Sequence, residues 1–112
     1  MKISRWSKSG WKPIHSGTVL AHFTLSKAEM HAPFLLIWAK LEANTEMATD
    51  QGHPEGEVFV ITEGKCRMIV GEEEAVLGEG DTIYIPPNTP HQGINDTDTD
   101  MSLICIKYPE VR

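Results

Sequence analysis

Short apolar segments separated by turn-forming residues dominate the hydrophobic pattern of the chain after its first thirty residues. The segments are rich in β-branched and aromatic residues, which favour strands, and helical periodicity is scarce. Many short strands at close spacing are typical of an antiparallel sandwich or barrel. We predict strands over residues 34–43, 57–62, 65–70, 74–77, 82–85 and 101–107.

Glycine, proline, asparagine and aspartate mark the turns between these strands. In the proline turn of residues 86–90, Asn88 can adopt the positive φ that glycine would otherwise supply. The acidic run of residues 96–100 opens like a calcium loop, but Met101 and Lys107 stand where that loop needs glycine and glutamate. We therefore predict a solvated hairpin turn there.

The first thirty residues have a weaker pattern, with only a thin indication of a short helix at residues 26–30. Residues 1–40 hold six Lys or Arg against one Glu, whereas residues 41–112 hold four against fifteen Asp or Glu, a net +5 and −11. We predict an N-terminal arm, residues 1–30, and one barrel domain, residues 31–112. The basic arm either packs on the acidic body, in its own chain or across a homodimer, or is merely a solvated surface.

Composition and charge argue against a nucleic-acid partner, a secretory signal and a membrane-spanning segment. An acidic body offers no footprint for a nucleic-acid backbone. No secretory signal is visible, and the longest apolar run, residues 34–39, is too short to span a bilayer. Cys66 and Cys105 lack the CxxC spacing of a zinc or redox pair, so we expect two buried thiols in a reducing cytoplasm.

Four polar residues have the spacing of a metal site assembled from two strands. Gln51 and His53 are two residues apart and would project to one side of an extended chain. Glu57 opens the next strand after a turn, and His91 follows the proline turn on a separate strand. Two imidazoles, a carboxylate and an amide oxygen are a plausible shell for a divalent ion.

At these residues the chain resembles the cupin superfamily, whose motifs read G-x5-H-x-H-x3/4-E-x6-G and G-x5-P-x-G-x2-H-x3-N. The resemblance covers residues 42–107 and implies an all-β fold, the cupin double-stranded β-helix or jelly-roll barrel. Here the motifs read Gln51-x-His53-x3-Glu57-x6-Gly64 and Gly80-x5-Pro86-x-Asn88-x2-His91-x3-Asn95.

Gln51 is the main departure, because it stands where the family has its first metal histidine. An amide oxygen is a weaker donor than imidazole, which shifts preference toward harder ions. The Gln-x-His pair is similar to the zinc shell of type I phosphomannose isomerases, and a degenerate, metal-free pocket is the alternative. His15, His22 and His31 lack supporting spacing, and the tryptophans favour core or dimer packing over a stacking platform.

A metal held by Gln51, His53, Glu57 and His91 would be Zn, Mn, Fe, Ni or Cu and would attract a small hydroxy acid, keto acid or sugar derivative. Alternation from Glu57 places Phe59 and Ile61 on the same face, as an apolar wall for that ligand. Isomerase-like or lyase-like Lewis-acid chemistry, dioxygenase chemistry and non-catalytic binding or sensing all remain open. The resemblance to short cupins also implies a homodimer with N-terminal strand exchange.

Overall fold

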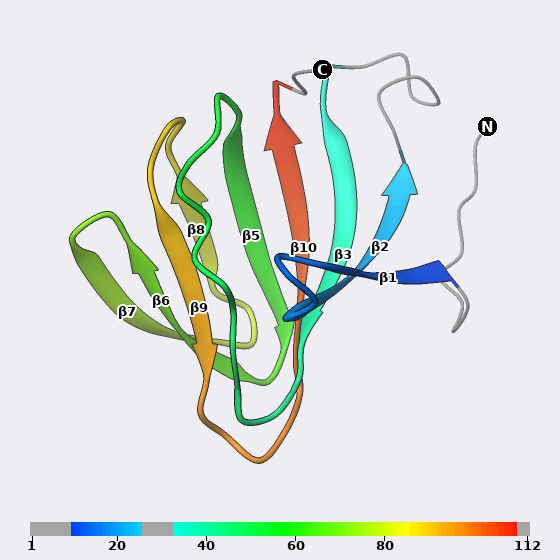
Figure 1. Cartoon of the computed structure of the whole chain (residues 1–112), viewed down its shortest axis with the longest axis vertical. Coiled ribbons are helices and arrows are strands. Elements are labelled where there is room, and N and C mark those ends of the chain that lie inside the picture. The colour runs from blue at the N-terminus through cyan, green and yellow to red at the C-terminus, as the bar shows by residue number, and fades with distance from the viewer. Residues whose placement is uncertain (1–9, 26–32, 110–112) are drawn as a thin grey trace.

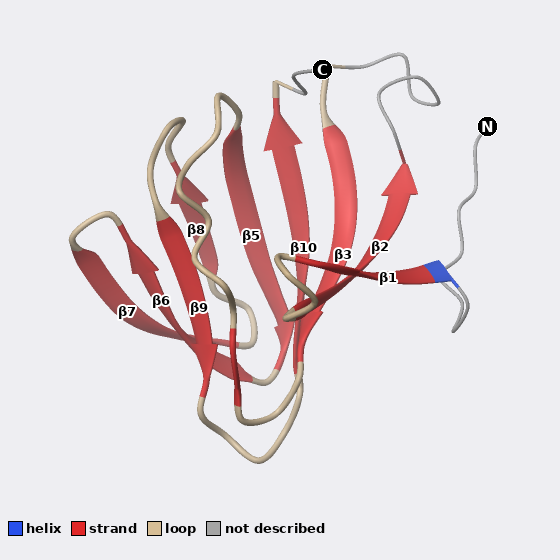
Figure 2. Ribbon diagram, viewed as in Figure 1, coloured by secondary structure: helices blue, strands red, loops and turns tan. Residues whose placement is uncertain are grey.

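Two antiparallel sheets face each other and form a barrel that is open at one end (Figures 1 and 2). The computed structural model describes residues 10–25 and 33–109. One sheet has six strands, in the order β1 (Trp11–Ile14), β2 (Val19–Leu25), β3 (Leu35–Leu41), β10 (Met101–Tyr108), β5 (Gly56–Glu63) and β8 (Thr82–Ile85). The other has four, in the order β4 (Thr45–Glu46), β9 (His91–Asn95), β6 (Lys65–Val70) and β7 (Glu73–Gly78). The predicted all-β jelly roll is confirmed.

Alternating side chains build the core between the two sheets. On β10 the inward positions are Met101, Leu103 and Cys105, each at most 4% exposed, while the residues between them are half-buried. Strand β5 alternates in register with β10, so that Phe59 lies opposite Cys105. Burial of these apolar faces is the main force that holds the sheets together.

The six predicted strands are present with boundaries shifted by at most two residues. Four further strands were not predicted. Strand β9 follows the proline turn directly and is half polar in sequence, and β4 has only two residues. Asn88 has the expected positive φ of 56°, and residues 96–100 form the turn between β9 and β10.

The described part of the predicted arm belongs to the barrel of its own chain. Strand β2 pairs with β3, and β1 pairs with β2, along the edge of the six-stranded sheet. Residues 1–9 and 26–30, including the predicted short helix, lie outside the described residues. Strand exchange in a homodimer stays a prediction.

Two findings bear on the remaining expectations about the chain. Cys66 and Cys105 are both buried and free of disulfides, as predicted. Among residues 10–25 and 33–109, no helix is long and apolar enough to cross a membrane.

Candidate metal centre

The candidate centre lies between the sheets, where the loop of residues 47–55 passes the first residues of β5 and β9. Glu57 is the second residue of β5 and His91 is the first residue of β9. His53 lies in the loop, whose Asp50 forms an isolated bridge with His91, with both backbone N–H to O distances 2.9 Å. Three separate segments of the chain therefore supply the side chains.

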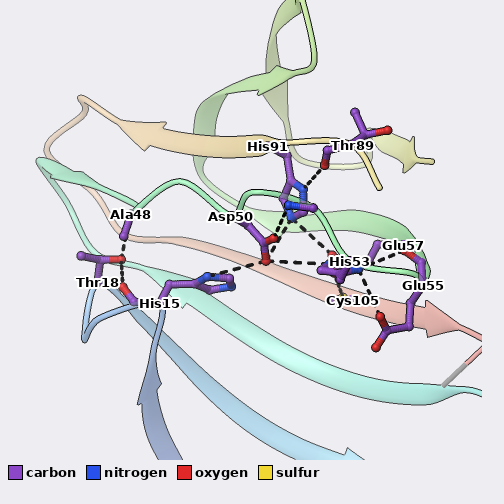
Figure 3. Close-up of polar contacts among 11 residues, drawn as sticks. His15, Thr18, Ala48, Asp50, His53, Glu55, Glu57, Thr89, His91 and Cys105 are labelled. Carbon is purple, nitrogen blue, oxygen red and sulfur yellow. Dashed lines mark hydrogen bonds and ion pairs between the residues drawn. The ribbon is translucent and has the colours of Figure 1, made fainter. Parts of the chain in front are cut away.

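The donor atoms of these side chains converge on one point, as Figure 3 shows. His53 Nε2 lies 2.5 Å and His91 Nε2 3.3 Å from Glu57 Oε1. Asp50 Oδ2 lies 3.8 Å from each of the same two nitrogens. The donor atoms of Asp50, His53 and His91 all lie within 4.8 Å of one another, so these residues form a potential metal site.

Both imidazoles are oriented by backbone carbonyls. His53 Nδ1 lies 3.0 Å from the Glu55 oxygen, and His91 Nδ1 lies 2.9 Å from the Thr89 oxygen. A carbonyl only accepts, so each Nδ1 carries a hydrogen, and the neutral form of each ring would turn an Nε2 lone pair toward Glu57. Two acceptors face each other there, and the arrangement requires a proton or a cation between them. Such outer hydrogen bonds are typical of metal-binding histidines.

Glu57 is held as a carboxylate in spite of its burial. Its Oε2 accepts a hydrogen bond of 2.9 Å from the Cys105 thiol. Burial raises the pKa of the Glu57 carboxyl, but the hydrogen bonds with His91 and Cys105 outweigh it and lower the pKa to about 2. For His91, burial lowers the pKa, and the hydrogen bond to Glu57 reverses this and raises it. A buried carboxylate charge therefore lies between the two imidazoles, beside Asp50.

In the part of the chain that the structure describes, Gln51 has no side-chain hydrogen bond to the residues that converge. Its side chain is exposed, and within the described residues no hydrogen bond or ion pair joins it to the histidines. Its role as a metal ligand stays a prediction, and Asp50, whose Oδ2 lies 3.8 Å from both Nε2 atoms, is a further candidate ligand.

A one-residue slip of the chain explains why Asp50 faces inward. Glu46 lies opposite Ile94, so a regular ladder would place Thr49 opposite His91, but Asp50 stands there. One extra residue reverses the facing of everything that follows. Gly52 then has a φ of +106°, and its N–H donates a 2.9 Å hydrogen bond to Asp50 Oδ1, so the chain from 50 to 53 is not extended.

His15 was set aside on its sequence spacing, yet it lies at this site. It comes from the β1–β2 turn, and its Nδ1 is 3.9 Å from Asp50 Oδ2 (Figure 3). Burial lowers the pKa of its imidazole, with the Asp50 charge acting in the opposite direction. No local sequence pattern marks this residue, because the contact joins segments that are 35 positions apart.

A cavity of about 260 Å³ lies beside the converging donors. Phe59 lines it, as predicted from alternation, and its ring centroid is 6.4 Å from that of His91. Ile61 is 1% exposed and belongs to the core rather than to the cavity wall. The rest of the lining is mainly apolar and includes Ile37, Met47, Met68, Met101 and Leu103.

Comparisons with known proteins identify a family match over most of the barrel. A family model described as a cupin domain, Cupin_2, matches residues 37–107. An uncharacterised protein of Methanocaldococcus jannaschii, MJ1618, is 40% identical over 53 residues, which are 47% of this chain and 42% of that protein. The chain thus matches less than half the length of that relative.

Solved structures share the fold at low sequence identity. A predicted oxalate decarboxylase from Thermotoga maritima has a TM-score of 0.83 at 20% identity, with 95% of this chain and 97% of that chain covered. KdgF from a Halomonas species has a TM-score of 0.81 at 13% identity, with 99% and 96% covered. The plu4264 protein of Photorhabdus luminescens has 0.81 at 23% identity, with 96% and 88% covered. Such likeness shows the fold alone.

Proposed function

Because this chain belongs to the Cupin_2 family, we propose that it holds one divalent metal ion and binds a small oxygen-rich molecule at that ion. The proposed ligands are Asp50, His53, Glu57 and His91. The observation that carries the proposal is the convergence of two Nε2 lone pairs and two carboxylate oxygens while both Nδ1 atoms are held by carbonyls. That arrangement suits a metal ion, which would take the place that a proton otherwise occupies between the imidazoles and the carboxylates.

The donor set narrows the kind of ion. Two imidazoles and two carboxylates suit zinc, manganese and iron, and remain compatible with nickel and copper. Exchanging the Gln51 amide for the Asp50 carboxylate adds a negative charge, so a divalent ion with both carboxylates has a formal charge of zero. With the Asp50 carboxylate in place of the Gln51 amide, the site should prefer harder ions more strongly.

The chemistry that such an ion supplies is Lewis-acid polarisation of a carbonyl oxygen, which fits isomerase-like or lyase-like reactions of hydroxy or keto compounds. The side chains of the chain set the surroundings. Cys105 and the two histidines fix the Glu57 carboxylate, and Phe59 closes one wall of the cavity. A cavity of about 260 Å³ is just below the ~300–1,000 Å³ of drug-sized ligand sites, which favours a compact molecule.

A dioxygenase is the second candidate. Two histidines with one carboxylate are the donor set of non-haem iron oxygenases. Asp50, His53 and His91 form such a set, with Glu57 beside it. Oxygen uptake that depends on both iron and an added keto acid would favour the dioxygenase. Metal-dependent ligand binding without turnover would favour a non-catalytic binding or sensing module.

Metal titration of matched neighbours tests the proposal. Untagged protein is analysed for bound metal, and the affinity for Zn²⁺ and Mn²⁺ is then measured by calorimetry for the wild type, Asp50→Asn and Gln51→Ala. We expect Asp50→Asn to weaken binding at least about tenfold, because it removes a charged donor, and Gln51→Ala to leave it unchanged. His91→Ala should abolish binding.

Two results would contradict the proposal. Absence of metal binding in the wild type would remove the metal centre altogether. Loss of affinity in Gln51→Ala, with none in Asp50→Asn, would restore Gln51 as the ligand in place of Asp50.

A further inference from the structure

A lysine faces the interior of the barrel beside the candidate centre. Lys107 continues the inward series of Met101, Leu103 and Cys105 on β10, and it lines the same cavity as Glu57 and His91. It is half-buried, and its charge acts on both Glu57 and His15. A cation in an apolar cavity is costly unless an anion accompanies it.

No carboxylate of the described residues forms a close ion pair with this lysine. Lys107 stands directly opposite Glu57 in the β10–β5 register, where an ion pair would be expected. Both oxygens of Glu57 are already engaged, Oε1 by the two histidines and Oε2 by Cys105. Among residues 10–25 and 33–109, no carboxylate oxygen lies within 4.0 Å of the Lys107 ammonium.

His15 lies near Lys107 at the same cavity. Its backbone φ is 51°, Ser16 and Gly17 also have positive φ, and the Thr18 hydroxyl donates a 2.7 Å hydrogen bond to the His15 carbonyl. The Ala48 N–H donates to the same hydroxyl over 2.9 Å, which ties this turn to the loop that carries Asp50. The turn that carries His15 is therefore fixed, and the imidazole is a second polar group on the cavity wall.

The charges of the site determine where an anion would bind. With Asp50 and Glu57 both bound, a divalent ion has no net charge to attract an anion. Lys107 supplies the missing positive charge, and the His15 imidazole supplies a hydrogen-bond donor. Apart from Lys40, the remaining lining is mainly apolar, with three methionines and Phe59, and offers few partners for the hydroxyls of a sugar.

From these observations we infer that the site takes a small 2-oxo or 2-hydroxy carboxylate with a compact apolar body, whose carboxylate is held by Lys107 with His15 beside it. The inference rests on the proposed function, since the oxygen next to the carboxylate is the group that reaches the metal. It narrows the ligand from oxygen-rich molecules in general to amphiphilic acids.

Calorimetry with a defined acid tests this inference. The probes are 4-methyl-2-oxopentanoate, its uncharged methyl ester and the sugar acid gluconate, each titrated into zinc-loaded protein. Lys107→Met should bind 4-methyl-2-oxopentanoate at least about tenfold more weakly than the wild type, because it loses a charge-assisted hydrogen bond. Lys107→Arg should retain most of the affinity, and the ester should bind wild type and Lys107→Met equally.

Lys65→Met, which removes an exposed lysine at the start of β6, is the matched control and should change nothing. A thermal melt of each variant shows whether it is folded, and Lys107→Gln replaces Lys107→Met if that variant is not. Equal binding of acid and ester by the wild type, tighter binding of gluconate, or full affinity in Lys107→Met would each overturn the inference. If zinc does not bind, the proposed function fails, and the same acid titration on metal-free protein tests the lysine site by itself.

Discussion

The two cysteines show how equal burial leads to different roles. Cys66 on β6 is 2% exposed and Cys105 on β10 is 4% exposed. Burial raises the pKa of the Cys66 thiol to about 11, and also raises that of Cys105, to which the nearby Glu57 charge adds. Cys66 only fills the core, whereas Cys105 donates to the carboxylate of the candidate centre.

The raised pKa of Cys66 predicts a loss of stability in alkali. The Cys66 thiol ionises near pH 9 in the unfolded chain and near pH 11 in the folded protein. Its contribution to the free energy of unfolding is therefore complete below pH 9 and is lost as the pH rises from 9 to 11. Between pH 8 and pH 10.5, we expect the free energy of unfolding to fall by about 2 kcal/mol more in the wild type than in Cys66→Ala. Urea unfolding at both pH values measures it, and equal losses in the two proteins would contradict the assignment.

At the scale of single residues, sequence reasoning found three of the residues that converge. His53, Glu57 and His91 lie together as their spacing predicted. Asp50 was overlooked because a one-residue slip cannot be read from alternation, which assumes a regular ladder. His15 was rejected for lack of spacing and Lys107 was overlooked, because their neighbours at the site are distant in sequence.

At the scale of elements, the loop of residues 47–55 depends on one glycine. Gly52 has a φ of +106°, and a Cβ there would lie 2.9 Å from the backbone carbon of Asn88. The Asn88 N–H also donates a 2.7 Å hydrogen bond to the His53 carbonyl. The loop that carries Asp50 and His53 is therefore packed directly on the proline turn that precedes His91.

Replacing this glycine should damage both the fold and the site. We expect Gly52→Ala to destabilise by about 2–3 kcal/mol, from backbone strain plus the clash with Asn88, and to weaken zinc binding at least about tenfold. Gly80→Ala is the control, since Gly80 has a φ of +88° but nothing within 4 Å of a Cβ. That variant should lose about 1 kcal/mol and keep its zinc affinity.

Urea unfolding and zinc calorimetry of the two variants separate strain from packing. If Gly52→Ala and Gly80→Ala behave alike, the close approach to Asn88 does not hold the site.

The predictability of the elements follows from how much of each pattern is local. Strands with one buried face, such as β5 and β10, alternate clearly and were predicted nearly to their ends. Strand β2 was not predicted, because His22 on its outer face is buried beside Trp11 and obscures the alternation. Strand β9 is polar where it enters the site, and a functional sequence of this kind resembles a loop.

At the scale of the whole molecule, the centre joins one strand of each sheet and the loop of residues 47–55, so metal binding should stabilise the entire barrel. At a free metal concentration of about 100 Kd, binding to the folded state alone adds about 2.7 kcal/mol. For a domain of this size that corresponds to a rise in Tm of about 10 °C. Differential scanning calorimetry with zinc and with a chelator measures it, and Asp50→Asn, whose zinc affinity we expect to be at least about tenfold weaker, should show at most about half of this rise. An unchanged Tm in wild type would argue against a site that both sheets share.

The hairpin of β1 and β2 has a consequence for how the boundaries of this protein are drawn. The family match begins at residue 37, after both strands. Yet the hairpin contributes Ile14, His15 and Val19 to the cavity wall and pairs with β3. A fragment limited to the matched region would keep the two cupin motifs but would lose the part of the cavity wall that the hairpin supplies. The region that the family match recognises is therefore shorter than the region that has to be expressed for binding measurements.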